Sequence, residues 1–304
     1  MANPIVALIY DFDKTLSPGD MQEYGFMPLI KSNPDEFWAL CADFKRSHSS
    51  DGILAYMYMM INKAKELELT RESLRSMGND VEFYPGVEGW FERVNAIGEQ
   101  CGVQVEHYII SSGVQEIIEG SAIGDRFKAI FAASFCYDEN GRPMWPATAV
   151  NYTSKTQYLF RINKGILDVT NDSDLNAYTP HHKRRIPFSN MVYIGDGLTD
   201  VPCMKMTRQR GGYSIAVHAP GKTDISDDML LQDRADFAVL ADYSAGSELE
   251  QIAGELFRRI RATHELNERH ERQLRMAAER KGAVVPESGM RGGLTEDRAL
   301  EEIE

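Results

Sequence analysis

The chain has 304 residues, of which 43% are hydrophobic, so it can form one large domain or two moderate ones with a sizeable core. Its net charge of −13 argues against general binding to nucleic acid or to an anionic membrane. The first residues, 1–4, carry no basic segment, and no apolar run approaches the ~20 residues that span a bilayer. The four cysteines are scattered without a CxxC pair, which fits a reducing compartment, so we expect a cytoplasmic protein.

The first predicted element is a buried strand at residues 4–11, which ends in two carboxylates, Asp11 and Asp13. A buried strand tolerates charge where it leaves the core, and ligands of open α/β sheets bind at that edge. Residues i and i+2 of a strand share a face, so both carboxylates can reach one pocket. They would repel each other there unless a proton or cation lies between them. An all-oxygen ligand set favours Mg²⁺.

The next part of the chain, residues 19–83, has a helical pattern without strand periodicity. Asn33 and Pro34 have the positions of an N-cap and a first helical residue, and Asp51 precedes a second helix. Pro85-Gly86 marks the return to an α/β pattern. We therefore expect a helical cap inserted into an α/β domain.

The remainder of the chain alternates strands with helices, which predicts a doubly wound parallel sheet. Four of the predicted elements carry polar motifs or turns. They are a strand at 103–110 that ends in Ser111-Ser112-Gly113 where a helix begins, a hairpin at 131–145, a helix at 154–162 with Lys155 near its start, and a strand at 191–194 before Gly195-Asp196-Gly197-Leu198-Thr199-Asp200. Short strands at 213–217 and 237–239 follow, and residues 248–280 read as one long charged helix before a loose acidic tail.

These motifs resemble, in order, the four signatures of the haloacid dehalogenase superfamily in its Mg²⁺-dependent phosphatase branch. The signatures are an Asp-x-Asp-x-Thr segment, a strand ending in Ser, a Lys, and a Gly-Asp-Gly-x-x-Asp segment. The resemblance covers residues 4–245 and is greatest to the phosphoserine-phosphatase-like group. It implies an α/β fold with a Rossmann-like core at 1–18 and 84–245, a helical cap at 19–83, and a C-terminal helix and tail at 246–304.

The resemblance also implies a role for each motif residue. Asp11 would be the nucleophile that forms an aspartyl-phosphate, and Asp13 the general acid and base. Asp11, the backbone carbonyl of Asp13, and Asp196 would bind Mg²⁺, and Asp200 would be a further ligand or accept a hydrogen bond from water on the metal.

The phosphate group would be bound by a second set of residues. Ser111 would donate to the phosphoryl oxygens, helped by the backbone amides of Ser112 and Gly113 at a helix N-terminus. Lys155 would balance the negative charge, while Thr15 would support the loop and orient Asp13.

Several positions have an alternative interpretation. Lys164 could take the place of Lys155, because a lone lysine is usually a surface residue. Asp20 or Glu23 could bind an amino group of the substrate, but a solvated acidic loop explains both. The insertion at 171–187 contains His181-His182-Lys183-Arg184-Arg185, which we interpret as a basic turn facing solvent rather than a substrate-anion site.

We therefore expect a Mg²⁺-dependent phosphatase acting on a small phosphorylated metabolite, without a nucleic-acid or membrane partner, as a monomer or homodimer. A phosphomutase of the same superfamily would have the same motifs. A phospho-acceptor signalling domain also uses Asp, Mg²⁺, Ser or Thr, and Lys, but is shorter and lacks the residue equivalent to Asp13.

Overall fold

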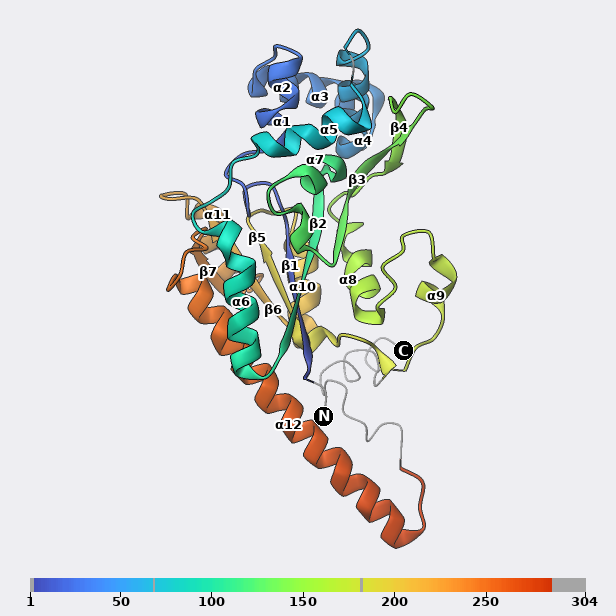
Figure 1. Cartoon of the computed structure of the whole chain (residues 1–304), viewed down its shortest axis with the longest axis vertical. Coiled ribbons are helices and arrows are strands. Elements are labelled where there is room, and N and C mark those ends of the chain that lie inside the picture. Colours follow the sequence, from blue (N-terminus) through green and yellow to red (C-terminus); the bar gives the residue numbers. More distant parts are fainter. Residues whose placement is uncertain (1–2, 68, 181–182, 286–304) are drawn as a thin grey trace.

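A computed structural model of the protein describes residues 3–67, 69–180 and 183–285. A seven-stranded sheet with the order β4-β3-β2-β1-β5-β6-β7 forms its centre (Figure 1). The strands are β1 (Ile5–Tyr10), β2 (Gln104–Val114), β3 (Ala129–Tyr137), β4 (Pro143–Thr148), β5 (Met191–Gly195), β6 (Tyr213–His218) and β7 (Phe237–Leu240). Neighbouring strands pair in parallel except for the β3–β4 hairpin. The predicted doubly wound sheet is confirmed, with one antiparallel edge strand.

Strand β1 lies in the middle of the sheet, where Tyr10 pairs with Ile109 of β2 and Ile194 of β5. Its side chains alternate between two cores: Leu8 and Tyr10 belong to one and Ile9 to the other. Since all three strands run in parallel, their carboxyl ends meet at one edge. This is the edge at which the sequence places its polar motifs.

Helices cover both faces of the sheet (Figure 1). Those on one face are α6 (Val87–Cys101) and α12 (Glu248–Lys281), and those on the other are α8 (Lys155–Lys164), α10 (Val201–Gln209) and α11 (Asp224–Leu231). The predicted long charged helix is therefore present as α12, whose buried residues end at Ile260 and whose remaining turns extend beyond the sheet. The predicted tail from residue 286 onward lies outside the described residues.

The segment between β1 and β2 folds into helices that gather at the carboxyl edge of the sheet, at the top of Figure 1. They are α1 (Met21–Tyr24), α2 (Phe26–Leu29), α3 (Pro34–His48), α4 (Gly52–Lys63), α5 (Arg71–Ser76) and the 3₁₀ turn η1 (Met77–Asp80). Asn33 and Asp51 cap α3 and α4 as predicted, each accepting from backbone N–H groups. Phe26 and Met57 of these helices share a core with Tyr10 of the sheet.

The helix predicted to begin at Ser111–Gly113 begins later, so that prediction is wrong. Strand β2 continues through an irregular register to Val114, which pairs with Ala133 of β3. Because pairing with β3 holds these residues in extended conformation, α7 (Gln115–Gly120) starts only at Gln115. The short 3₁₀ turn η2 (Gly124–Arg126) then leads into β3.

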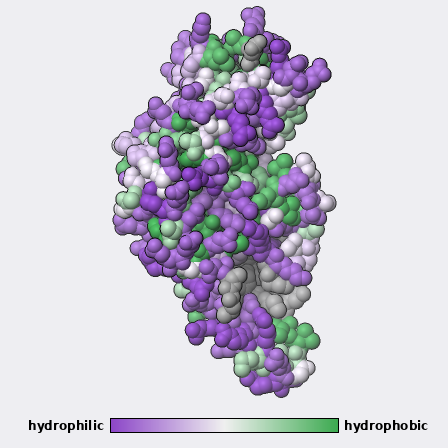
Figure 2. Space-filling model, in the orientation of Figure 1, coloured by the Kyte–Doolittle hydropathy of each residue, from purple (hydrophilic) through white to green (hydrophobic). Residues whose placement is uncertain are grey.

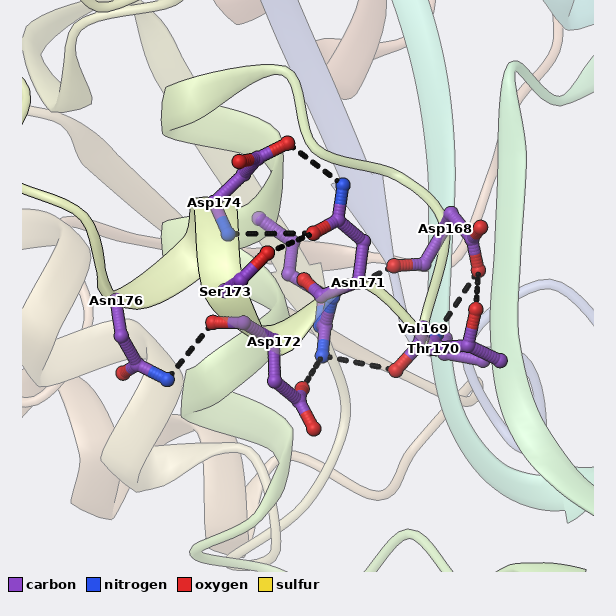
Figure 3. A network of polar contacts seen from close by, with 9 residues as sticks. Asp168, Val169, Thr170, Asn171, Asp172, Ser173, Asp174 and Asn176 are labelled. Carbon is purple, nitrogen blue, oxygen red and sulfur yellow. Dashed lines mark hydrogen bonds and ion pairs between the residues drawn. The ribbon is translucent and has the colours of Figure 1, made fainter.

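The insertion between α8 and β5 contains α9 (Asp172–Asn176) and the 3₁₀ turn η4 (Phe188–Asn190). Figure 3 shows the polar network of its first loop. Arg161 of α8, 2% exposed, donates to the carbonyl oxygens of Asp168 and Val169 at 2.8 and 3.1 Å and to the Asp172 carboxylate at 2.9 Å. A buried guanidinium thus organises this acidic loop and fixes it to the helix that begins with Lys155.

The basic turn predicted to face solvent is partly anchored to the sheet. Arg185 donates to both carboxylate oxygens of Glu106 in β2 at 2.5 and 2.6 Å, and Glu106 is buried. Arg185 is exposed, as predicted for a turn that faces solvent, and its guanidinium also supplies the charged partner that the buried carboxylate needs. His181 and His182 lie outside the described residues.

The molecular surface is polar on the face seen in Figure 2, where apolar residues form separate small areas. Among the described helices, none combines the length and the apolar composition that a membrane crossing requires.

Candidate active site

Asp11 and Asp13 follow β1 directly, and their side chains have different partners. Asp11 accepts a hydrogen bond from the amide of Phe12 at 2.8 Å, and its other oxygen lies 2.9 Å from Lys155 Nζ. Asp13 accepts from the amide of Met21, at the start of α1, at 2.7 Å. The two carboxylates therefore have separate partners, Asp11 at the start of α8 and Asp13 at the start of α1.

Lys155 has no exposed surface and lies between two carboxylates. Its Nζ is 2.9 Å from Asp11 and 2.8 Å from Asp200 Oδ1. Burial lowers the pKa of Lys155, but the charges of Asp11 and Asp200 outweigh this and raise it, so the ammonium stays protonated. Lys164, the alternative residue, donates instead to the carbonyl oxygens of Leu175 and Ala177 in the insertion.

Asp11, Asp196 and Asp200 form an acidic cluster, in which one carboxylate oxygen of each residue lies within 4.8 Å of the others. Asp11 and Asp200 are buried, and Asp196 is partly exposed. The donors are all oxygens, which is the ligand set that hard divalent cations prefer. The arrangement therefore fits a metal ion of this class at the carboxyl edge of the sheet.

The cluster holds more negative charge than its surroundings compensate. Burial and the charges of Asp200 and Asp11 raise the pKa of Asp196 to about 8, and burial and the charge of Asp200 raise the pKa of Asp11 to about 6. Burial, followed by the charges of Asp20 and Asp11, also raises the pKa of Asp13 well above its usual value. A raised pKa favours the protonated form of Asp13, as a general acid requires.

Ser111 and Ser112 lie at the irregular end of β2, and they line a cavity together with Asp11 and Asp13. The amide of Gly113 donates to Ser111 Oγ at 3.0 Å, which leaves the Ser111 hydroxyl hydrogen free to donate elsewhere. Tyr56 of α4 donates to the carbonyl oxygen of Ser112 at 2.6 Å. The expected amide donors are thus not in a helix N-terminus, and the Gly113 amide is used within the turn.

Two loop residues have other partners than the sequence suggested. Thr15 Oγ1 lies 3.4 Å from Asp196, rather than against Asp13, so its predicted orienting role is wrong. Asp20 pairs with Lys14 at 2.8 and 2.9 Å through both carboxylate oxygens, and is not a freely solvated acid.

A cavity of about 260 Å³ opens onto the cluster. Asp11, Asp13 and Ser111 line it, together with Ile53 of α4 and Tyr152 of the β4–α8 loop. Asn151, the residue before Tyr152, donates to Asp51 at the start of α4 at 3.2 Å. The site is therefore built jointly by the sheet and by the helices between β1 and β2.

Sequence reasoning missed Tyr193, which is completely buried in β5 and donates to Asp200 Oδ1 at 2.7 Å. Burial and the charge of Asp200 raise its pKa well above the usual value, so the hydroxyl remains a donor. A tyrosine in an apolar strand reads as a core residue. No local pattern indicates that its hydroxyl reaches a carboxylate on the following turn.

Gly195 offers a steric test of the cluster. A Cβ at this position would lie 2.5 Å from Asp200 Oδ2 and 2.6 Å from its Cγ. We expect Gly195→Ala to displace the Asp200 carboxylate and to weaken Mg²⁺ binding about 10-fold or more, as loss of a supporting contact does in other metal sites. Isothermal titration with Mg²⁺ measures this, with Gly254→Ala in α12 as a control on glycine replacement, because a Cβ at that position would meet its nearest atoms at 3.5 and 3.7 Å. Unchanged affinity in Gly195→Ala would show that Asp200 does not support the metal.

Comparisons with known proteins give one relative by sequence and several by fold. An uncharacterized protein of Borreliella burgdorferi is 29% identical over 228 residues, which cover 66% of this chain and 78% of that protein. A probable phosphoserine phosphatase from Vibrio cholerae has a TM-score of 0.53 at 13% identity, covering 86% of this chain and 67% of its own. A substrate-bound phosphoserine phosphatase has a TM-score of 0.50 at 14% identity, and the match covers 81% of this chain and 96% of that phosphatase. These structures share the fold.

The family model of haloacid dehalogenase-like hydrolases matches residues 8–205, which extend from β1 to α10. This range includes Asp11, Lys155 and both acidic residues that follow β5. The chain therefore belongs to the haloacid dehalogenase-like hydrolase family.

Proposed function

We propose that the protein is a Mg²⁺-dependent phosphatase that hydrolyses a small phosphate monoester through an aspartyl-phosphate on Asp11. The observation that carries the proposal is the placement of Asp11, which lines a cavity, pairs with a buried lysine and lies close to two further carboxylates. In the same cavity Asp13 has a raised pKa and a different hydrogen-bond partner. A nucleophile and a proton carrier are thus available as separate groups.

The reaction begins with attack of an Asp11 carboxylate oxygen on phosphorus, which forms a P–O bond as the bond to the leaving alcohol breaks. Asp13 gives its proton to the leaving oxygen and then takes a proton from the water that attacks the phosphorus of the aspartyl-phosphate. This second step releases inorganic phosphate and restores Asp11. Bound Mg²⁺, held by Asp11, Asp196, Asp200 and the Asp13 carbonyl, would offset the charge of the phosphate dianion.

The phosphoryl oxygens need donors that stay in place during both steps. Ser111 can provide its hydroxyl hydrogen because the Gly113 amide already fills a lone pair of Ser111 Oγ. Lys155 is held by Asp11 and Asp200, so its charge is fixed beside the attacking oxygen. We propose that the Ser112 amide donates to the phosphoryl oxygens, whereas the Gly113 amide positions the Ser111 side chain.

We also propose that the helices within residues 19–83 act as a cap that restricts the substrate. They lie over the carboxyl edge of the sheet (Figure 1), and Tyr56 contacts the Ser112 carbonyl. The cavity of about 260 Å³ lies below the range of about 300–1,000 Å³ typical of pockets for drug-sized ligands. A phosphorylated metabolite with a small leaving group fits this volume better than a macromolecular phosphate.

The direct test is a screen of small phosphate monoesters with Mg²⁺, in which both inorganic phosphate and rearranged phosphosugars are measured. The proposal predicts phosphate release from at least one small monoester, dependent on Mg²⁺ and absent in Asp11→Asn. An isomerised phosphosugar without free phosphate would identify a mutase instead.

Mg²⁺ should stabilise the fold more strongly at high pH than at low pH. An unfolded Asp titrates at about 3.9, whereas without metal Asp196 has a pKa of about 8. Between these two pKa values the folded chain keeps a proton on Asp196 that the unfolded chain has lost, so the stability of the metal-free protein falls as the pH rises. Metal ions replace these protons.

Thermal melts with Mg²⁺ and with EDTA, at pH 5.5 and pH 8.5, measure this effect. We expect a larger rise in Tm on addition of Mg²⁺ at pH 8.5. An equal rise at both values would contradict competition between metal and protons at the cluster.

A further inference from the structure

Tyr193 lies beneath the acidic cluster and is not one of the residues that line the cavity. It is in β5, three residues before Asp196, and it is completely buried in the core that also contains Ile9. Its hydroxyl donates to Asp200 Oδ1 at 2.7 Å. The hydroxyl is the donor of this hydrogen bond, and the carboxylate oxygen accepts.

Asp200 depends on a small number of donors for its orientation. Lys155 Nζ, at 2.8 Å, and Tyr193 both bind Oδ1. Among the described residues, Oδ2 accepts a long hydrogen bond, 3.4 Å, from the amide of Gly197. Two strong donors therefore hold one oxygen and leave the other with free lone pairs, which is the arrangement a metal-ligating carboxylate needs.

Lys155 cannot hold Asp200 independently of the nucleophile, because its Nζ is also 2.9 Å from Asp11. A movement of Lys155 toward Asp11 or toward a phosphoryl group would pull on Asp200 as well. Tyr193 provides Asp200 with a neutral donor that belongs to the rigid central sheet and is independent of that charge. The chain of contacts runs Tyr193–Asp200–Lys155–Asp11.

We propose that Tyr193 is a positioning residue, whose hydroxyl fixes the Asp200 carboxylate for cation binding and so lets Lys155 serve Asp11 and the phosphoryl group. The inference rests on the proposed metal role of Asp200. It predicts that loss of the hydroxyl weakens metal binding, although Tyr193 is not a ligand.

The test is Tyr193→Phe, which keeps the buried ring and removes only the hydroxyl. Its control is Tyr108→Phe. Tyr108 is also fully buried, lies in the same core on the neighbouring part of the sheet, and donates to the carboxylate of Glu106 at 2.6 Å. Each variant therefore loses a tyrosine–carboxylate hydrogen bond, one at the cluster and one away from it, and Tyr108→Phe also loses a contact of 3.2 Å from Arg185.

Binding of Mn²⁺, followed by the loss of its free-ion electron paramagnetic resonance signal and by competition with Mg²⁺, gives a readout that is independent of turnover. We expect Kd to rise about 10- to 100-fold in Tyr193→Phe, the range for loss of contacts that orient metal ligands. Tyr108→Phe should keep the parent Kd. Equal affinity of Tyr193→Phe and the parent would overturn the inference alone, whereas no Mn²⁺ binding by the parent would overturn the proposed metal site with it.

A double-variant cycle distinguishes positioning from general destabilisation. In an Asp200→Asn background the hydroxyl has no carboxylate to orient, so Tyr193→Phe should change Kd little further. Additive losses in Tyr193→Phe/Asp200→Asn would mean that Tyr193 acts on the site by another route and would overturn the inference.

Discussion

Asp11→Asn is expected to lower the rate of phosphate release by at least about 10⁴-fold, since loss of a nucleophile removes the covalent route. Asn has nearly the same shape, and its oxygen can still accept from the amide of Phe12, which Asp11 contacts at 2.8 Å. The fold should therefore survive. Steady-state phosphate release with Mg²⁺ and a substrate found by the screen measures the loss.

Asp125→Asn is a matched control, because its carboxylate is 82% exposed and lies on the surface next to Arg126. It should retain the parent kcat and KM. Circular dichroism and a thermal melt should give folded protein for both variants. Near-normal activity in folded Asp11→Asn would contradict the assignment of the nucleophile.

Lys155→Met is expected to destabilise the protein by about 3–5 kcal/mol at neutral pH, the usual cost of breaking a buried ion pair from one side. The variant leaves Asp11 and Asp200 together in a buried site without their shared cation. It should also lose activity, because the lysine charge stabilises the transferring phosphoryl group. Urea unfolding and phosphate release measure the two effects.

The stability deficit of Lys155→Met should increase from pH 5 to pH 8. Burial and the charge of Asp200 raise the pKa of Asp11, and Lys155 opposes this, so removing the lysine raises the Asp11 pKa further. The contribution of Asp11 to stability is then present at low pH and is lost as the pH rises. Lys164→Met in the same helix is the control, since Lys164 binds carbonyl oxygens of the insertion. It should retain activity. Equal loss of activity in the two variants would contradict a specific role for Lys155.

The central strand and its polar end could be predicted from sequence because both depend on local patterns. A run of apolar residues needs burial on both faces, and Asp11 marks the point where it leaves the core. The order of the four motifs then places Asp11, Lys155 and Asp196 at one edge. The helix caps at Asn33 and Asp51 were equally predictable, since a cap is formed by residues that are neighbours in sequence.

Other features depend on contacts between distant residues and have no local signal. β2 continues past Ser111 because Val114 pairs with β3, so the helix start was placed too early. Thr15 contacts Asp196, which is 181 residues away, rather than the nearby Asp13. The hydroxyl of Tyr193 reaches Asp200 only because the turn after β5 folds back over the strand.

The most direct test of the account is a rapid-quench experiment with a ³²P-labelled substrate and Mg²⁺. Acid quenching during turnover should trap one acid-stable phosphoryl group per chain, and mass spectrometry of the digested protein should place it on Asp11. With a substrate whose leaving group needs no protonation, Asp13→Asn should still form this species and should hydrolyse it slowly, because the attacking water lacks a base, and Asp11→Asn should form none. Phosphate release at a normal rate without labelled Asp11, at any quench time, would contradict the aspartyl-phosphate mechanism.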